Sequence, residues 1–174
     1  FADDDSPFVM RGVYASNIPW NIASVTTDNW TFEEWKWYIE LLNAAGCNLL
    51  KLYIWSTHYF HPEEPALVGN QWRYDIWCEA LTYARVMGME TLVGFSSTTV
   101  PPTTWLRYPE LRAQEVNYTG NTLCWKRGRD RILSFQGYLI DRFSDVADGF
   151  VLWFADPGAC RCPHCRDYLA VMLD

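Results

Sequence analysis

Residues 47–55 read CNLLKLYIW, and this nearly continuous apolar run decides the expected fold. A strand of a parallel sheet has this composition when both of its faces are buried. A helical pattern precedes it at residues 31–45, and a second helix is expected at residues 74–87, ending before Gly88. Strands that alternate with helices in this way predict a parallel sheet with right-handed crossovers.

The same alternation continues on both sides of this region. Apolar runs predict further strands at residues 11–15, 91–95 and 149–154. A third helix is expected at residues 129–147, and a fourth helix is expected to begin within residues 163–173. A flavodoxin-like sheet fits the same elements but has shorter loops. Long loops after each strand are typical of barrel enzymes, which build their sites at the strands' carboxyl ends. We therefore predict an α/β fold, a TIM-type (β/α)8 barrel of which this chain supplies about the first four βα units.

Length, charge and composition narrow the function. The chain has 174 residues, whereas a complete barrel takes about 250, so we expect residues 1–174 to be the N-terminal half of a barrel domain in a longer chain. The net charge of −7 disfavours nucleic-acid binding. The sequence contains no apolar stretch long enough to predict a membrane span. Aromatic residues make up 17% of the chain, and flat sugar faces stack well on Trp and Tyr.

Cysteines form the most specific motif. Residues 160–165 read CRCPHC, and three thiols this close suit ligands that converge on one tetrahedral metal ion. Cys124 lies in the loop after the third strand, which neighbours the loop after the fourth strand in a parallel barrel. We expect a structural zinc site with four cysteine ligands: Cys124, Cys160, Cys162 and Cys165. His164 is the competing fourth ligand, and disulfides or free thiols would also be compatible with the motif. Reduced thiols slightly favour a cytoplasmic protein, and secretion is the competing location.

The order of several short motifs resembles the front half of the family 42 β-galactosidases, which are retaining glycoside hydrolases of clan A. The motifs are GCNLLKL at residues 46–52, HPEE at 61–64, MGMETLVG at 87–94, PPTTWLRYPEL at 101–111, Cys124 and the CRCPHC run. The resemblance covers roughly residues 44–170 and implies a barrel with a zinc site of four cysteines. It also implies a catalytic Asn-Glu pair at the end of the fourth strand. This chain has Ala155-Asp156 there, so a wider group of barrel glycosidases, including hexosaminidase-like and α-glucuronidase-like members, fits equally well.

Candidate catalytic and binding residues follow from these expectations. Asp156 stands just beyond the fourth strand, where it would act as the general acid that protonates the leaving oxygen. Five residues at strand ends or in the following loops are candidates for sugar binding: Tyr14, Asn17, Trp55, His58 and Trp105. Trp105 alternatively packs its own loop. Lys51 lies within a strand and needs a partner, either a structural carboxylate or a substrate anion.

The sequence thus favours a glycoside hydrolase that acts on a β-galactoside or related oligosaccharide by carboxylate acid/base catalysis. Two further functions stay open: a non-catalytic carbohydrate-binding barrel and a zinc-stabilised scaffold domain. The expected partners are a carbohydrate and the remainder of the barrel, which either belongs to the same longer chain or comes from a homo-oligomer.

Overall fold

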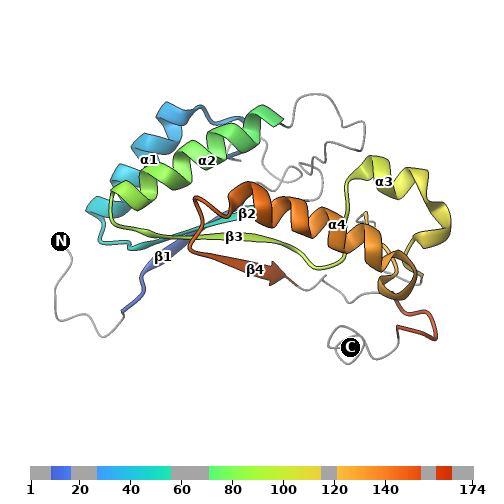
Figure 1. Cartoon of the computed structure of the whole chain (residues 1–174). Coiled ribbons are helices and arrows are strands. Elements are labelled where there is room, and N and C mark those ends of the chain that lie inside the picture. The colour runs from blue at the N-terminus through green and yellow to red at the C-terminus, as the bar shows by residue number, and fades with distance from the viewer. Residues whose placement is uncertain (1–8, 17–26, 56–70, 115–120, 154–159, 166–174) are drawn as a thin grey trace. The chain divides into compact units, whose positions relative to one another are not determined.

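A computed structural model describes residues 9–16, 27–55, 71–114, 121–153 and 160–165. It contains one four-stranded parallel sheet in the order β1-β2-β3-β4 (Figure 1). The strands are β1 (Gly12–Ser16), β2 (Leu49–Ile54), β3 (Glu90–Ser96) and β4 (Gly149–Trp153). The helices are η1 (Thr27–Asn29), α1 (Phe32–Ala44), α2 (Gln71–Val86), α3 (Pro102–Arg107), η3 (Pro109–Leu111) and α4 (Trp125–Phe143). The elements form two compact units, described separately below.

The first unit contains β1, α1, β2 and α2 with most of β3 and the start of β4. Its α1 begins with a capping box, because Thr31 Oγ1 accepts from the Glu34 backbone while Glu34 Oε2 accepts from the Thr31 backbone. Helices α1 and α2 lie together over one face of the strands (Figure 1). The buried side chains between them and the sheet include Trp35, Ile39, Leu42, Leu50, Leu52, Tyr74, Trp77, Leu81 and Val93. This helix-covered face forms the core of the unit.

The opposite face of the same strands bears a different set of side chains. Tyr14 and Lys51 are register partners on β1 and β2, and the Lys51 Nζ lies 5.1 Å from the centre of the Tyr14 ring. A Cβ on Gly94 would lie 2.9 Å from Tyr53 Cδ2, so β3 brings a glycine to the place where β2 carries Tyr53. Tyr14 is 44% exposed, whereas the helix-facing side chains are buried. In a closed barrel this second face lines the interior.

The second unit contains the segment after β3, α3, most of α4 and residues 160–165. The sequence pattern predicts a loop here, but Pro102 starts the short helix α3 and η3 follows it. Two antiparallel bridges, Thr99 with Thr122 and Arg112 with Leu123, fold this segment back on itself. Tertiary pairing of this kind leaves little trace in local periodicity, which is why the sequence does not reveal it.

The predicted strands and the first three helices are confirmed with shifted ends. The helix expected at residues 129–147 begins and ends earlier, as α4 (Trp125–Phe143). Its first turn includes Gly128, where an added Cβ would lie 3.1 Å from Leu123 Cβ. The helix expected to begin at Pro163 does not begin there, since the Cys165 backbone donates to the Cys162 carbonyl in a turn. The rest of that expected helix lies outside the described residues. Within the described residues, no helix is long and apolar enough to cross a membrane.

Candidate metal centre

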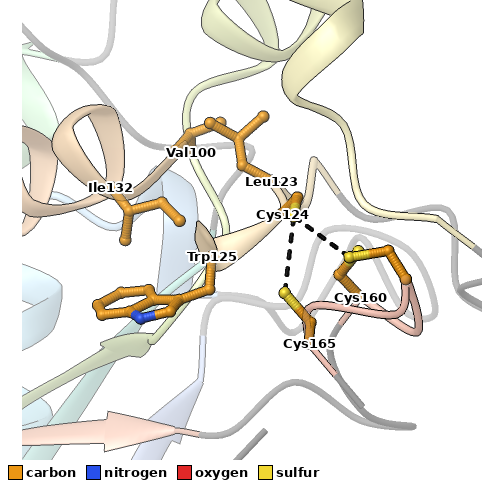
Figure 2. Packing of buried hydrophobic residues seen from close by; sticks show 8 residues of the cluster. Val100, Leu123, Cys124, Trp125, Ile132, Cys160 and Cys165 are labelled. Carbon is orange, nitrogen blue, oxygen red and sulfur yellow. Dashed lines mark hydrogen bonds between the residues drawn. The ribbon is translucent and has the colours of Figure 1, made fainter. Parts of the chain in front are cut away.

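Four cysteines of the second unit come together in one buried cluster. The sulfurs of Cys124, Cys160, Cys162 and Cys165 all lie within 4.8 Å of one another. Cys124 Sγ lies 3.6 Å from Cys165 Sγ and 3.8 Å from Cys162 Sγ, and none of the thiols forms a disulfide. Figure 2 shows the side chains of Cys124, Cys160 and Cys165 directed toward one another. The structure therefore assembles the four predicted ligands, and His164 is exposed and not among them.

Backbone pairing places the cysteines from two parts of the chain. The Cys124 backbone N–H donates to the Leu111 carbonyl at 2.8 Å, which fixes Cys124 immediately before α4. The Arg161 backbone N–H donates to the Gln114 carbonyl at 3.0 Å. The segment that follows β3 is thus hydrogen-bonded to the segment that carries the CRCPHC run.

Backbone N–H groups point at the sulfurs. The Gln114 N–H donates to Cys160 Sγ at 3.2 Å. The backbone N–H groups of Cys162 and Lys126 act to lower the pKa values of Cys160 and Cys165, although burial outweighs them. Hydrogen bonds are stronger when the acceptor is charged, so this set of donors favours thiolates over thiols. Donors to ligand sulfurs also orient metal-bound thiolates.

Charges around the cluster act unequally on the four thiols. Burial raises the pKa of Cys124, but hydrogen bonds from the side chain and backbone of Arg127 and from two neighbouring thiols outweigh it and lower this pKa to about 7. The positive end of α4 acts in the same direction. Burial raises the pKa of Cys160, and it raises the pKa of Cys165 to about 12 with a contribution from Cys124. One thiolate therefore hinders its neighbours from ionising, and a bound cation would relieve that repulsion.

The geometry fits a tetrahedral ion held by sulfur. A Zn–S bond of about 2.3 Å gives a tetrahedron whose sulfurs stand about 3.8 Å apart. Two of the six sulfur–sulfur separations, at 3.6 and 3.8 Å, match that edge. Soft thiolates in a tetrahedral arrangement suit zinc or an iron–sulfur centre and do not suit hard cations. The four cysteines are therefore arranged to hold a metal ion.

Apolar side chains close the cluster from water. The four cysteines belong to one buried cluster with Val100, Leu123, Trp125 and Ile132, and Leu123 and Trp125 flank Cys124 (Figure 2). Trp105, Leu111 and Ala113 pack against this cluster. Because all four positions around an ion would be filled by sulfur, a metal held here has no open position for a substrate or a water.

The other predicted site residues are spread over several elements. Tyr14 lies on β1 on the face away from the helices, and Trp55 is half-buried directly after β2. Trp105 lies in α3, where the Arg112 guanidinium stacks 3.8 Å from its ring centre and donates from Nε to its carbonyl. This contact is of the loop-packing kind, and the contact of Trp105 with a sugar stays a prediction. Asn17, His58 and Asp156 lie outside the described residues.

Sequence reasoning missed two features of the second unit. Arg127 lowers the pKa of Cys124, and the sequence signal for it was a basic run that resembles an ordinary solvated helix start. A polar run at residues 96–99, SSTT, ends β3 and is buried. There the Gln136 Nε2 donates to the Ser97 carbonyl at 2.7 Å, and the Ser97 N–H donates to the Trp153 carbonyl at 2.9 Å. Four polar residues after an apolar strand were a signal that this strand end is not ordinary core.

Comparison with known proteins bears on the fold. No protein-family model matches the chain, and no curated protein matches its sequence. The structure of the GH20 β-N-acetylhexosaminidase from Streptomyces coelicolor A3(2) matches with a TM-score of 0.59 at 18% identity, over 96% of this chain and 36% of that chain. Dispersin B matches with a TM-score of 0.53 at 16% identity, over 82% of this chain and 48% of that chain.

The pneumococcal virulence factor StrH, studied for N-glycan recognition and hydrolysis, matches with a TM-score of 0.51 at 10% identity, over 80% of this chain and 39% of that chain. The chain has the fold of a partial (β/α)8 barrel. It spans less than half of the length of each of these three proteins. These structural neighbours are glycoside hydrolases with barrel folds, and the resemblance to family 42 stays a prediction.

Proposed function

We propose that the chain is part of a glycoside-hydrolase barrel whose loops are joined by a structural zinc ion. The observation that carries the first half of this proposal is the partial barrel together with its neighbours, among which are a β-N-acetylhexosaminidase and an N-glycan-hydrolysing protein. Fold alone does not fix an activity, because this barrel supports many reactions. The aromatic-rich composition and the acidic residue after β4 are what favour a sugar substrate in this chain.

The proposed acid is Asp156. It follows β4 (Gly149–Trp153) after two intervening residues, and catalytic groups of barrel enzymes stand at the carboxyl ends of the strands. Its role is to protonate the oxygen of the leaving group, while a second carboxylate from the remainder of the barrel acts as nucleophile or base. Tyr14, Asn17, Trp55 and His58 are proposed to contact the sugar. A β-galactoside is the substrate that the family 42 resemblance implies.

Zinc is the proposed ion because four cysteines around one tetrahedral position form its common structural site. When bound, the ion supplies no chemistry to the reaction and acts as a cross-link. Cys124 anchors the segment after β3, and Cys160, Cys162 and Cys165 anchor the segment after β4. Both segments lead from the strand ends at which a barrel enzyme carries its site, so the cross-link would hold that site in shape.

Hydrolysis assays with the full chain test the proposed activity. A panel of aryl glycosides should include β-galactosides and β-N-acetylhexosaminides, because the resemblance and the structural neighbours point to different sugars. We expect turnover of at least one substrate, and a loss of about 100-fold or more in kcat for Asp156→Asn. Asp141→Asn, an acidic residue within α4, is the matched control and should retain activity. Equal activity of Asp156→Asn and the parent would remove Asp156 from the acid role.

A second function is favoured by one observation. Ala155-Asp156 replaces the Asn-Glu pair of family 42, and the shorter acid stands beside a residue that cannot hydrogen-bond a sugar hydroxyl. A carbohydrate-binding barrel without catalysis would tolerate this change. Binding of oligosaccharides, detected by tryptophan fluorescence, in the absence of any turnover would establish that function. If the protein shows neither oligosaccharide binding nor turnover, the zinc-stabilised scaffold domain is the function that remains.

The partner needed to complete the barrel is proposed to be the remaining βα units of a longer chain. The sheet face that carries Tyr14 is not covered by α1 or α2, and the outer surface of α1 exposes Trp37 and Leu41 one helical turn apart. Both surfaces are of the kind that a neighbouring βα unit covers in a closed barrel. A second copy of the chain is the competing partner. Light scattering of the full-length protein tests the second copy, because a monomer would rule out a barrel completed by another copy of the chain.

A further inference from the structure

Four arginines gather where the segment after β3 folds back on the start of α4. The Arg131 guanidinium lies 4.6 Å from the centre of the Tyr108 ring, and the Arg107 guanidinium lies 5.6 Å from the centre of the same ring. The Arg127 Nη2 donates to the Arg112 carbonyl at 2.9 Å. Two separate stretches of chain thus form one arginine cluster, which consists of Arg107, Arg112, Arg127 and Arg131.

The arginine cluster makes one region of an acidic chain positive. The chain has a net charge of −7, whereas residues 101–131 contain six basic and three acidic residues. Three members of the cluster are exposed, and Arg112 is partly buried. Among the described residues, the side chains of Arg112 and Arg127 donate to backbone carbonyls and form no ion pair with a carboxylate. A positive region of this kind attracts anionic ligands.

The placement of these charges is unfavourable for α4 itself. Arg127 and Arg131 are four residues apart on the helix, and like charges at this spacing repel each other. The first turn of α4 contains no acidic residue, although acidic side chains are the ones that stabilise a helix start. An anion bound between the cations would relieve this repulsion. The arrangement therefore favours an anion-binding surface over the solvated helix start that the basic run alone predicts.

Tyr108 restrains the arginines that would meet a ligand. A guanidinium that lies near an aromatic ring is attracted to it, and this contact reduces the freedom that ligand binding must otherwise remove. The same guanidinium can donate from its edge, where its N–H groups form a fork that matches two oxygens of one anion. Carboxylates and sulfates carry such paired oxygens. The cluster thus suits an acidic group of this shape.

We propose that the arginine cluster binds the acidic group of a carbohydrate substrate, which is a uronate carboxylate or a sulfate ester. This inference rests on the proposed carbohydrate function. Residues 107–112 belong to the segment that follows β3, and barrel enzymes bind substrates with the segments that follow their strands. Acidic groups spaced along a sugar chain suit a small positive region, whereas the net charge of the whole chain repels a dense polyanion such as a nucleic acid.

Binding of matched oligosaccharides to the full-length protein measures this preference. Each set contains a neutral oligomer, its uronate form and its sulfated form, all with a fluorescent label, and the sets are built on galactose and on N-acetylglucosamine. We expect one acidic form to bind at least about 10-fold more tightly than its neutral parent, with a difference that shrinks at high salt. Comparison of the uronate with the sulfate identifies the acidic group.

Substitutions on α4 locate the binding surface. Arg131→Gln should weaken binding of the acidic oligomer about 10-fold and leave the neutral one unchanged. Arg131→Lys should fall between, because it keeps the charge and loses the fork. Arg129→Gln is the matched control and should bind as the parent does, since Arg129 is also exposed but lies 5.6 Å from the centre of the Trp125 ring. Arg107→Gln repeats the test from α3 if Arg131→Gln fails to fold.

The outcomes separate this inference from the proposed carbohydrate function. If neutral and acidic oligomers bind equally, the carbohydrate function stands and the role of the arginine cluster is overturned. If no oligosaccharide binds, both fail. An equal loss in Arg131→Gln and Arg129→Gln, or equally tight binding of a polyglutamate peptide, would mean that any anion is attracted to the start of α4, and this would also overturn the inference.

Discussion

Replacement of Gly94 by alanine tests the face of the sheet that lines a barrel interior. The new Cβ would lie 2.9 Å from Tyr53 Cδ2 and 3.3 Å from Lys51 Cε. The lysine end can move aside, but the Tyr53 side chain is buried and its ring packs 5.9 Å from the Tyr14 ring. Insertion of a methyl group into a packed site of this kind costs about 1–3 kcal/mol of unfolding free energy. We expect Gly94→Ala to be destabilised by this amount.

Gly137→Ala is expected to have the opposite effect on stability. Gly137 lies within α4, and an added Cβ there meets nothing within 4 Å. Alanine in a helix interior is favoured over glycine by about 1 kcal/mol. For a chain of this length, 1 kcal/mol shifts the Tm by about 2–4 °C. Thermal unfolding of the full-length protein should therefore show Gly94→Ala several degrees below the parent and Gly137→Ala slightly above it. A Gly94→Ala variant as stable as the parent would refute the close approach of Tyr53 to β3.

Three further predictions concern the caps, one carboxylate and the cluster. Thr31→Ala removes the capping box with Glu34 and should lower the unfolding free energy by about 1 kcal/mol, measured by denaturant titration. A hydrogen bond from the backbone N–H of Thr91 holds the pKa of Asp148 below the ordinary value of an aspartate, although burial opposes this shift. The ionised carboxylate therefore stabilises the folded protein when the pH is above that ordinary value, and this stabilisation is lost as the pH falls through the lower pKa of the folded state. Asp148→Asn should therefore be less stable than the parent near neutral pH, with a difference that shrinks in acid unfolding measurements; a pH-independent difference would contradict this. Cys162→Ser should abolish metal retention and speed proteolysis of the segments around the cluster, whereas Cys78→Ser should retain the metal.

Local sequence pattern was sufficient for the first unit. The run at residues 47–55 predicts β2 because a buried parallel strand carries apolar side chains on both faces. The capping box of Thr31 and Glu34 marks the start of α1 because it is a contact between residues close in sequence. The end of α2 could also be predicted from Gly88, since a positive φ of 81° favours glycine at a helix end. Each of these features depends on neighbours along the chain.

The second unit depends on contacts between distant residues, and its prediction was less complete. The spacing of the CRCPHC run predicts three metal ligands, and the order of loops in a parallel barrel predicts Cys124 as the fourth. Nothing in the spacing reveals that Gln114 donates to Cys160, because this bond arises from the folded-back segment after β3. The catalytic assignment of Asp156 likewise needs the loop after β4, which lies outside the described residues.

Metal content is the most direct test of the central claim that a thiolate-bound zinc ion joins the segments after β3 and β4. Full-length protein purified under reducing conditions, without added metal or chelator, is analysed for metal by mass spectrometry of the intact chain and by zinc X-ray absorption. The account predicts one zinc ion per chain with four sulfur neighbours at about 2.3 Å, and none in Cys124→Ser. A metal-free chain with six free thiols, or an ion bound by nitrogen and oxygen, would contradict it.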